Sequence, residues 1–166
     1  MTHFLGTHQN RLDAKGRVSV PAPFRAALKA FNGSRESEAA GLNGSAIVLR
    51  PSHKHPCIEG WPPAVFKQLA STLERLDLFS EEHDDMAAAL YADAYPVESD
   101  KEGRIVLPEN LVAHAGISDT VVFMGLGRTF QIWEPAAADR RRAEARERAR
   151  TRAITLPGTP ADTAAT

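Results

Sequence analysis

Apolar and polar residues alternate along two short segments of the chain, 17–20 and 104–107, each of which follows an Asp-x-x-Gly turn. This period of two predicts β-strands with one apolar and one polar face. The apolar faces consist of Val18, Val20, Ile105 and Leu107. The polar faces carry Arg17 and Arg104, which we expect to point away from the core. The stretches expected to pair with these strands as hairpins are Thr7–Leu12 and Pro96–Ser99.

Spacings of three and four between apolar residues predict helices in other parts of the chain. The segments with this spacing begin at about Pro21, Pro63, Ser80 and Glu109. Two further pairs of strands are expected, namely about 46–50 with 57–61 and about 120–124 with 129–133. The pattern therefore predicts a β-rich α+β fold with peripheral helices.

The turn segment occurs twice in the chain. Asp13–Pro21 returns 87 residues later as Asp100–Pro108, with aspartate, glycine, arginine and proline identical in both copies. Such internal similarity indicates a tandem duplication. One unit cannot bury its own apolar face, so we expect the two to interlock into a small barrel with a two-fold pseudo-axis. The expected parts are 7–54 (first unit), 62–95 (helical connection), 93–136 (second unit) and 137–166 (Arg-rich helix and disordered tail).

Each turn combines two residue types with distinct roles. Asp13 and Asp100 are expected to accept hydrogen bonds from backbone amides, while Gly16 and Gly103 supply a positive φ angle. The arginine beside each turn has two interpretations. It can form a weak surface ion pair with the aspartate, or it can face outward toward a ligand. The two interpretations are compatible, because the aspartate can fix the turn while the arginine faces outward.

Charge is distributed unevenly, although 20 Lys+Arg against 21 Asp+Glu give a net charge of only −1. Residues 1–35 hold six bases and one acid, a net charge of +5, and residues 71–102 hold ten acids and two bases, a net charge of −8. Residues 139–152 hold seven arginines and three acids, a net charge of +4. Such basic segments favour binding of a polyanion, although ordinary solvated surface remains the alternative.

The residues from Leu12 to Pro21, with Phe24-Arg25 after them and the second copy at Asp100–Pro108, resemble the MraZ family of bacterial transcriptional regulators. The resemblance covers about residues 4 to 135. It implies two tandem AbrB-like swapped-hairpin units, assembly into a ring-shaped, octamer-like homo-oligomer, and sequence-specific binding to repeated promoter sites on double-stranded DNA. It further implies repression of the division and cell-wall operon, including the protein's own gene, and a cytoplasmic, nucleoid-associated location.

The resemblance also assigns the DNA contacts. By position they are Lys15 and Arg17 in the first unit and Lys101 and Arg104 in the second, with Arg11 as an addition from the preceding strand. Because the first turn stands in the +5 segment and the second in the acidic one, we expect the first turn to make the stronger contact. The apolar residues of the central helices, among them Phe66, Leu69 and Leu73, are expected to belong to the core or to subunit contacts.

Two other clusters have alternative interpretations. His53-x-His55-x-Cys57 carries three side chains that can bind metal, but it lacks a fourth ligand and is flanked by prolines. We therefore favour a solvated loop with a buried Cys57 over a metal site. The arginines of 140–152 can form an auxiliary phosphate-binding arm or a solvated helix with internal ion pairs.

The chain carries no dinucleotide-loop, phosphate-loop or Gly-x-Ser-x-Gly motif, so we expect no catalysis, no cofactor and no small-molecule substrate. No apolar run approaches the roughly 20 residues of a membrane helix, so we expect no membrane partner. The alternative to a DNA-binding regulator is an antitoxin-like or scaffold protein that binds a protein partner through its tail. Such a tail would need large apolar anchors, and this one offers only Ile154 and Leu156.

Overall fold

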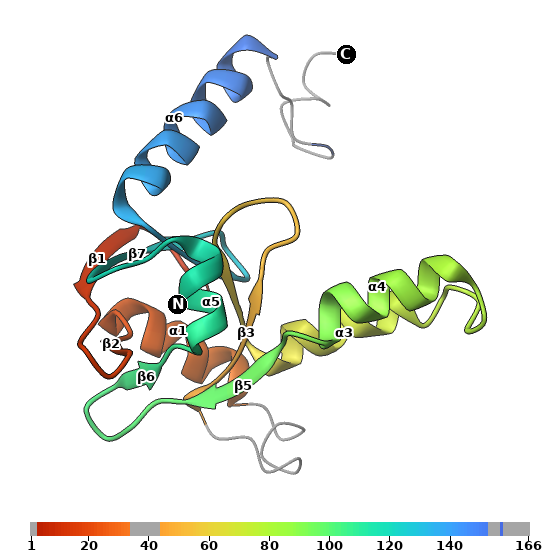
Figure 1. Cartoon of the computed structure of the whole chain (residues 1–166), viewed down its shortest axis with the longest axis horizontal. Helices are drawn as coiled ribbons and strands as arrows, with labels where there is room; N and C mark the ends of the chain where they lie inside the picture. The colour runs from red at the N-terminus through yellow and green to blue at the C-terminus, as the bar shows by residue number, and fades with distance from the viewer. Residues whose placement is uncertain (1–2, 34–43, 153–156, 158–166) are drawn as a thin grey trace. The chain divides into compact units, whose positions relative to one another are not determined.

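The computed structural model describes residues 3–33, 44–152 and 157 (Figure 1). Residues 34–43 and most of the tail expected at the end of the chain lie outside these residues. The strands are β1 (Thr7–Arg11), β2 (Arg17–Ser19), β3 (Ala46–Pro51), β4 (Ile58–Trp61), β5 (Tyr95–Glu98), β6 (Arg104–Val106), β7 (Thr120–Gly125) and β8 (Phe130–Trp133). The helices are α1 (Ala22–Asn32), α3 (Pro63–Leu73), α4 (Glu81–Tyr91), α5 (Glu109–Ala115) and α6 (Pro135–Thr151). The predicted α+β class is confirmed.

Six of these strands form one antiparallel sheet in the order β1-β7-β8-β4-β3-β5. The strands β1, β3 and β4 of the first unit correspond to β5, β7 and β8 of the second. Exchanging the two units therefore gives the same strand order, read from the opposite edge of the sheet. Each edge strand pairs with the other unit: β1 with β7, and β5 with β3. The two units therefore complete each other's sheet.

The expected pairing of the two strands that flank each turn is wrong. The turns are present, but β2 pairs with β6 of the other unit in a separate two-stranded ribbon. Across the first turn, an isolated β-bridge joins Leu12 to Val18. The reason is geometric, since β1 already pairs with β7 and belongs to the larger sheet, while β2 crosses to the ribbon.

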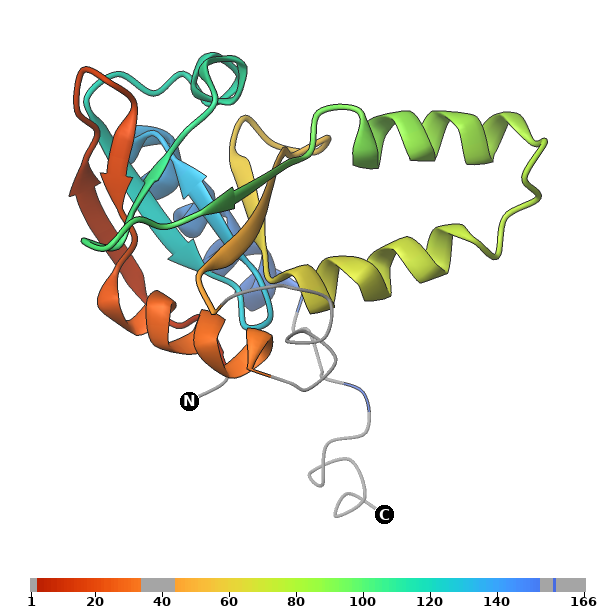
Figure 2. The ribbon, with the colours of Figure 1, turned by 90° about the horizontal axis from the view of Figure 1, so that it is seen from below.

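Proline and glycine mark the ends of the helices as the sequence predicts. Pro21, Pro62 and Pro108 precede α1, α3 and α5, and Gly116 ends α5 with a left-handed φ of 63°. Ser80 caps α4 by accepting a hydrogen bond from the amide of His83. Helices α3 and α4 run side by side and extend away from the sheet (Figure 2).

A buried arginine links this helix pair to the sheet. Arg50 of β3 is 1% exposed, and its Nη1 lies 2.5 Å from Oε1 of Glu59 on β4. Its Nη2 donates to the carbonyl of Ala89 in α4 at 2.8 Å, and Trp61 donates to the same Glu59 oxygen. A buried charge requires such partners, so this network anchors the C-terminal part of α4 to β3 and β4.

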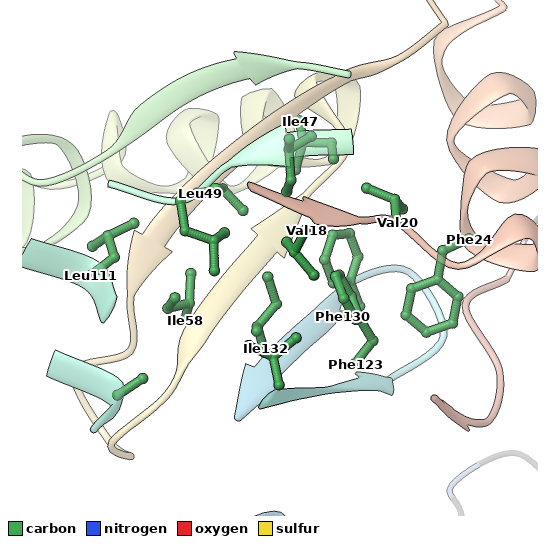
Figure 3. Close-up of a cluster of buried hydrophobic side chains, with 14 of the residues drawn as sticks. Val18, Val20, Phe24, Ile47, Leu49, Ile58, Leu111, Phe123, Phe130 and Ile132 are labelled. Carbon is green, nitrogen blue, oxygen red and sulfur yellow. The ribbon is translucent and has the colours of Figure 1, made fainter. Parts of the chain in front are cut away.

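The core lies between the ribbon and the sheet (Figure 3). Val18 and Ile105 come from the ribbon, each 1% exposed, and face fully buried side chains of the sheet. Those side chains include Ile47, Leu49, Ile58, Phe123, Phe130 and Ile132. Phe24 of α1 and Leu111 of α5, at equivalent positions of the two units, cover the core from the helices. The apolar faces predicted from the period of two are therefore confirmed.

The chain divides into two compact units, residues 1–135 and 136–166. The first contains both repeats and the helix pair α3–α4. The second contains almost all of α6, which confirms that the Arg-rich segment is helical. Ion pairs join Arg142 to Asp139 and Arg150 to Glu147 along α6. Pairing at this spacing stabilises a solvated helix modestly.

Candidate nucleic-acid interface

The first turn is built around the carboxylate of Asp13. Its Oδ1 accepts hydrogen bonds from the backbone amides of Lys15 and Arg17, both at 2.9 Å. Its Oδ2 accepts from Nε of Arg17 at 2.7 Å. Gly16 has a φ of 79°, which side chains other than glycine rarely adopt. The carboxylate therefore fixes both the turn and the Nε side of the arginine guanidinium.

The second turn repeats this geometry closely. Oδ1 of Asp100 accepts from the amides of Glu102 and Arg104 at 3.0 and 2.9 Å, and its Oδ2 accepts from Nε of Arg104 at 3.1 Å. Gly103 has a φ of 77°. One difference is that Nη2 of Arg104 also contacts Glu102, at 3.5 Å. The predicted roles of the aspartates and glycines in the turns are met at both sites.

These hydrogen bonds change the acidity of both aspartates. The amide of Arg17 lowers the pKa of Asp13 below its usual value, and the guanidinium of Arg17 and the amide of Lys15 lower it further. The amide of Arg104 likewise lowers the pKa of Asp100, with the positive charge of Arg104 adding to the effect. Both carboxylates are therefore charged at neutral pH, which keeps the arginines anchored.

The register of the ribbon places both arginines on one face. Arg17 pairs with Val106, and Arg104 pairs with Ser19. Paired residues of an antiparallel ladder point the same way, so these four side chains share the outer face, opposite Val18 and Ile105. Arg17 and Arg104 are diagonal neighbours, whose Cα atoms lie about 7–8 Å apart in such a ladder.

The other basic residues assigned from the sequence are exposed. Lys15 and Lys101 lie within the two turns, and Arg11 ends β1, beside Thr120 of β7. Within the described residues none of the three forms an ion pair. The turns themselves flank the ribbon from opposite ends, because the carbonyl of Gly16 accepts from Leu107 and that of Gly103 accepts from Val20.

Two basic residues beside the second turn were missed by sequence reasoning. Arg25 and Lys29 of α1 line a cleft of about 320 Å³ together with Lys101. Nη1 of Arg25 donates to the carbonyl of Val20 at 2.9 Å. The only sequence signal was their membership of the basic first segment, whose spatial neighbour is the turn of the other unit.

The His53–Cys57 segment folds as a tight loop. Oγ of Ser52 accepts from the amides of Lys54 and His55, and Cys57 is fully buried, as expected. Among residues 3–33, 44–152 and 157 there is no group of three His, Cys, Asp or Glu side chains that could hold a metal ion. The same part of the chain contains no helix long and apolar enough to cross a membrane.

Fold and turns together define a class of protein. An α+β fold is combined with a repeated segment whose strands pair with those of the other repeat, and each repeat carries one arginine bonded to an aspartate. A family described as "MraZ protein, putative antitoxin-like" matches residues 3–35 and 90–155. The chain belongs to the MraZ family.

Relatives named "Transcriptional regulator MraZ" are similar over almost the whole chain. That of Gluconacetobacter diazotrophicus is 65% identical over 158 residues, which cover 95% of either chain. That of Gluconobacter oxydans is 62% identical over 151 residues, 91% of this chain and 87% of the relative. That of Parvibaculum lavamentivorans is 44% identical over 148 residues, 89% and 86% respectively.

Proposed function

We propose that the chain is a transcriptional regulator that binds double-stranded DNA sequence-specifically through its two Asp-x-x-x-Arg turns. The observation that carries this proposal is the shared outer face of Arg17 and Arg104. Nε of Arg17 is held by Asp13, while its Nη atoms bond to none of the described residues. A guanidinium held in this way can donate two hydrogen bonds to a guanine edge, and a two-stranded ribbon fits the major groove.

The family supports the regulatory part of the proposal, since the relatives are named transcriptional regulators. We further propose that the regulated DNA is the promoter of the division and cell-wall operon, that regulation is repression, and that the protein's own gene is included. The protein would then act in the cytoplasm, at the nucleoid. Catalysis and a cofactor have no part in this function.

Assembly is part of the proposal. One ribbon with two arginines covers a small stretch of DNA, so high affinity requires several subunits on several repeated sites. A ring-shaped, octamer-like homo-oligomer would supply that repetition. A single repeat should then bind weakly compared with a spaced array.

The test is a binding titration on DNA from upstream of the protein's own gene, with the wild type and with Arg17→Ala and Arg104→Ala. Each lost bidentate base contact costs about 1–3 kcal/mol per engaged subunit, so specific binding should be lost or strongly weakened in both. Thermal melting of each variant should match the wild type, since both side chains are outside the core. Normal binding by both variants would refute the assignment, and loss of binding through lower melting would make the arginines structural.

A second candidate is an antitoxin-like protein that binds a protein partner, which the family description favours. The tail residues that would distinguish it, Ile154 and Leu156, lie outside the described residues. The two functions separate in the same titration. A regulator shifts its own upstream DNA as a purified protein, whereas a protein-binding module leaves that DNA free.

A further inference from the structure

The two turns have different surroundings, although their own geometry is nearly the same. The second turn lies against α1 of the first unit, where a Cβ atom added to Gly103 would come within 2.5 Å of Nη1 of Arg25. Arg25 is held there by the carbonyl of Val20, and the amide of Val20 in turn donates to the carbonyl of Gly103. A short chain of hydrogen bonds therefore fixes Arg25 beside the turn.

The cleft of about 320 Å³ at this place is lined by cations. Arg25 and Lys29 come from α1 and Lys101 from the turn, with Ser99 beside them. None of the three cations forms an ion pair with a described residue. The two carboxylates of the lining, those of Asp100 and Glu102, are engaged by Arg104.

The equivalent cleft of the other repeat provides an internal comparison. It lies between the first turn and α5, with a volume of about 650 Å³. The residue 87 positions after Arg25 is Val112, and the residue 87 positions after Lys29 is Gly116. Lys15 is the single cation of this lining, against two carboxylates, those of Asp13 and Glu109. The two clefts therefore differ in charge: three cations line the cleft beside the second turn and one lines the cleft beside the first, with two carboxylates in each.

We propose that the cleft between α1 and the second turn binds a phosphodiester group of the DNA backbone, with Arg25, Lys29 and Lys101 as its ligands. This inference rests on the proposed function. Three cations without ion-pair partners are suited to a phosphate, and phosphate contacts fix the position of a protein on DNA without reading its sequence. The phosphate held here would set the position of Arg104, on the adjacent ribbon, for its contact with a base.

The expected ranking of the two turns by the strength of their contact with DNA changes as a consequence. The sequence places the second turn in an acidic segment, which favours the first turn for the stronger contact. In the fold, however, the second turn receives Arg25 and Lys29 from the basic segment of the other unit. The second turn is therefore the stronger phosphate contact.

The test uses the full chain, the upstream duplex and an unrelated duplex of the same length, each titrated at several chloride concentrations. Lys29→Gln should weaken binding to both duplexes by about the same factor, at least about threefold, and reduce the slope of log K against log salt by about 1. Arg25→Gln should do the same. Lys67→Gln, which removes an exposed lysine of α3, is the matched control and should change neither quantity.

The outcomes separate the two proposals. If the wild type binds neither duplex, both proposals are refuted. If the wild type binds but Lys29→Gln has the same affinity and salt slope as Lys67→Gln, the phosphate site alone is refuted. If Arg25→Gln melts at a lower temperature, Lys29→Gln alone decides, because its side chain is exposed. Inorganic phosphate is the last probe. If the wild type binds it saturably, and Lys29→Gln abolishes this binding while keeping the wild-type affinity for DNA, the cleft binds a free anion. That result would overturn the assignment of the cleft to the DNA backbone.

Discussion

At the scale of single residues, the carboxylates of Asp13 and Asp100 organise the candidate interface. Each accepts two backbone amides through one oxygen and an arginine Nε through the other. The guanidinium is thereby held through Nε, while its two Nη atoms remain outside the core. The sequence could predict this arrangement, because the Asp-x-x-Gly-Arg spacing is local and turn chemistry depends on neighbouring residues.

Titration of the two aspartates tests this geometry. In the wild type both should titrate below the usual value of 3.8. A lowered pKa in the folded state means that the charged carboxylates stabilise the turns above the unfolded pKa of about 3.9, and this stability is lost as the pH falls through the folded pKa. In Arg17→Ala the pKa of Asp13 should rise yet stay below 3.8, because the amides of residues 15 and 17 still donate. Carboxyl ¹³C chemical shifts measure this, and a pKa of Asp13 that returned fully to the usual 3.8 would contradict the role of the amides.

At the scale of elements, the strands were predictable, and so were the two local pairings, β3 with β4 and β7 with β8. The pairings between the two units, such as β2 with β6, were not. The period of two identifies the faces of β2 and β6, since each face follows from the residues of one strand. Their pairing joins segments 87 residues apart, and nothing within either segment specifies it. For the same reason the sequence did not identify Arg25 and Lys29 as candidate DNA contacts, because their neighbours in space belong to the other unit.

Close packing between β4 and β8 provides a test of the sheet. A Cβ atom added to Gly60 would overlap the ring of Phe130, which is fully buried. Gly60→Ala should therefore lower the free energy of unfolding by about 1–3 kcal/mol, measured by denaturant melting. Combination with Phe130→Leu should cost less than the sum of the two single changes, since the smaller side chain makes room. Strict additivity would mean that the two residues do not touch.

Helix α6 should be dispensable for the fold. Almost all of it belongs to a compact unit distinct from residues 1–135, and Arg142 and Arg150 form ion pairs within the helix. A chain that ends at Ala138 should keep the melting temperature of the wild type. If the arm binds phosphates, the truncated chain should bind all DNA more weakly with a flatter salt dependence. Unchanged affinity and slope would make α6 a solvated helix only.

At the scale of the whole molecule, the helix pair α3–α4 exposes apolar surface that could make subunit contacts. Leu73 is buried, whereas Phe66 and Leu69 are half-buried. Among the described residues, the most exposed large apolar side chains lie in the connection between the two helices, Leu78 at 63% and Phe79 at 91%. Helical spacing identified the helices correctly but could not show which of their apolar residues would be buried.

The oligomer prediction follows from this surface. Light scattering of the full chain should give a mass well above the 18.0 kDa of one chain. Replacing both Leu78 and Phe79 by serine should lower that mass without lowering the melting temperature, because neither side chain belongs to the core. A monomeric wild type at micromolar concentration would refute the ring.

The exchange of strands between the two units also has a consequence for the time course of synthesis. Arg11 of β1 pairs with Thr120 of β7, so the partner is translated about 109 residues later. At about 5–20 residues per second, β1 waits on the order of 5–20 s before its partner has left the ribosome. An unpaired strand is an aggregation hazard mainly when it is apolar, and β1 reads Thr-His-Gln-Asn-Arg. Its polar composition is therefore suited to a strand that must remain exposed while the second unit is still being made.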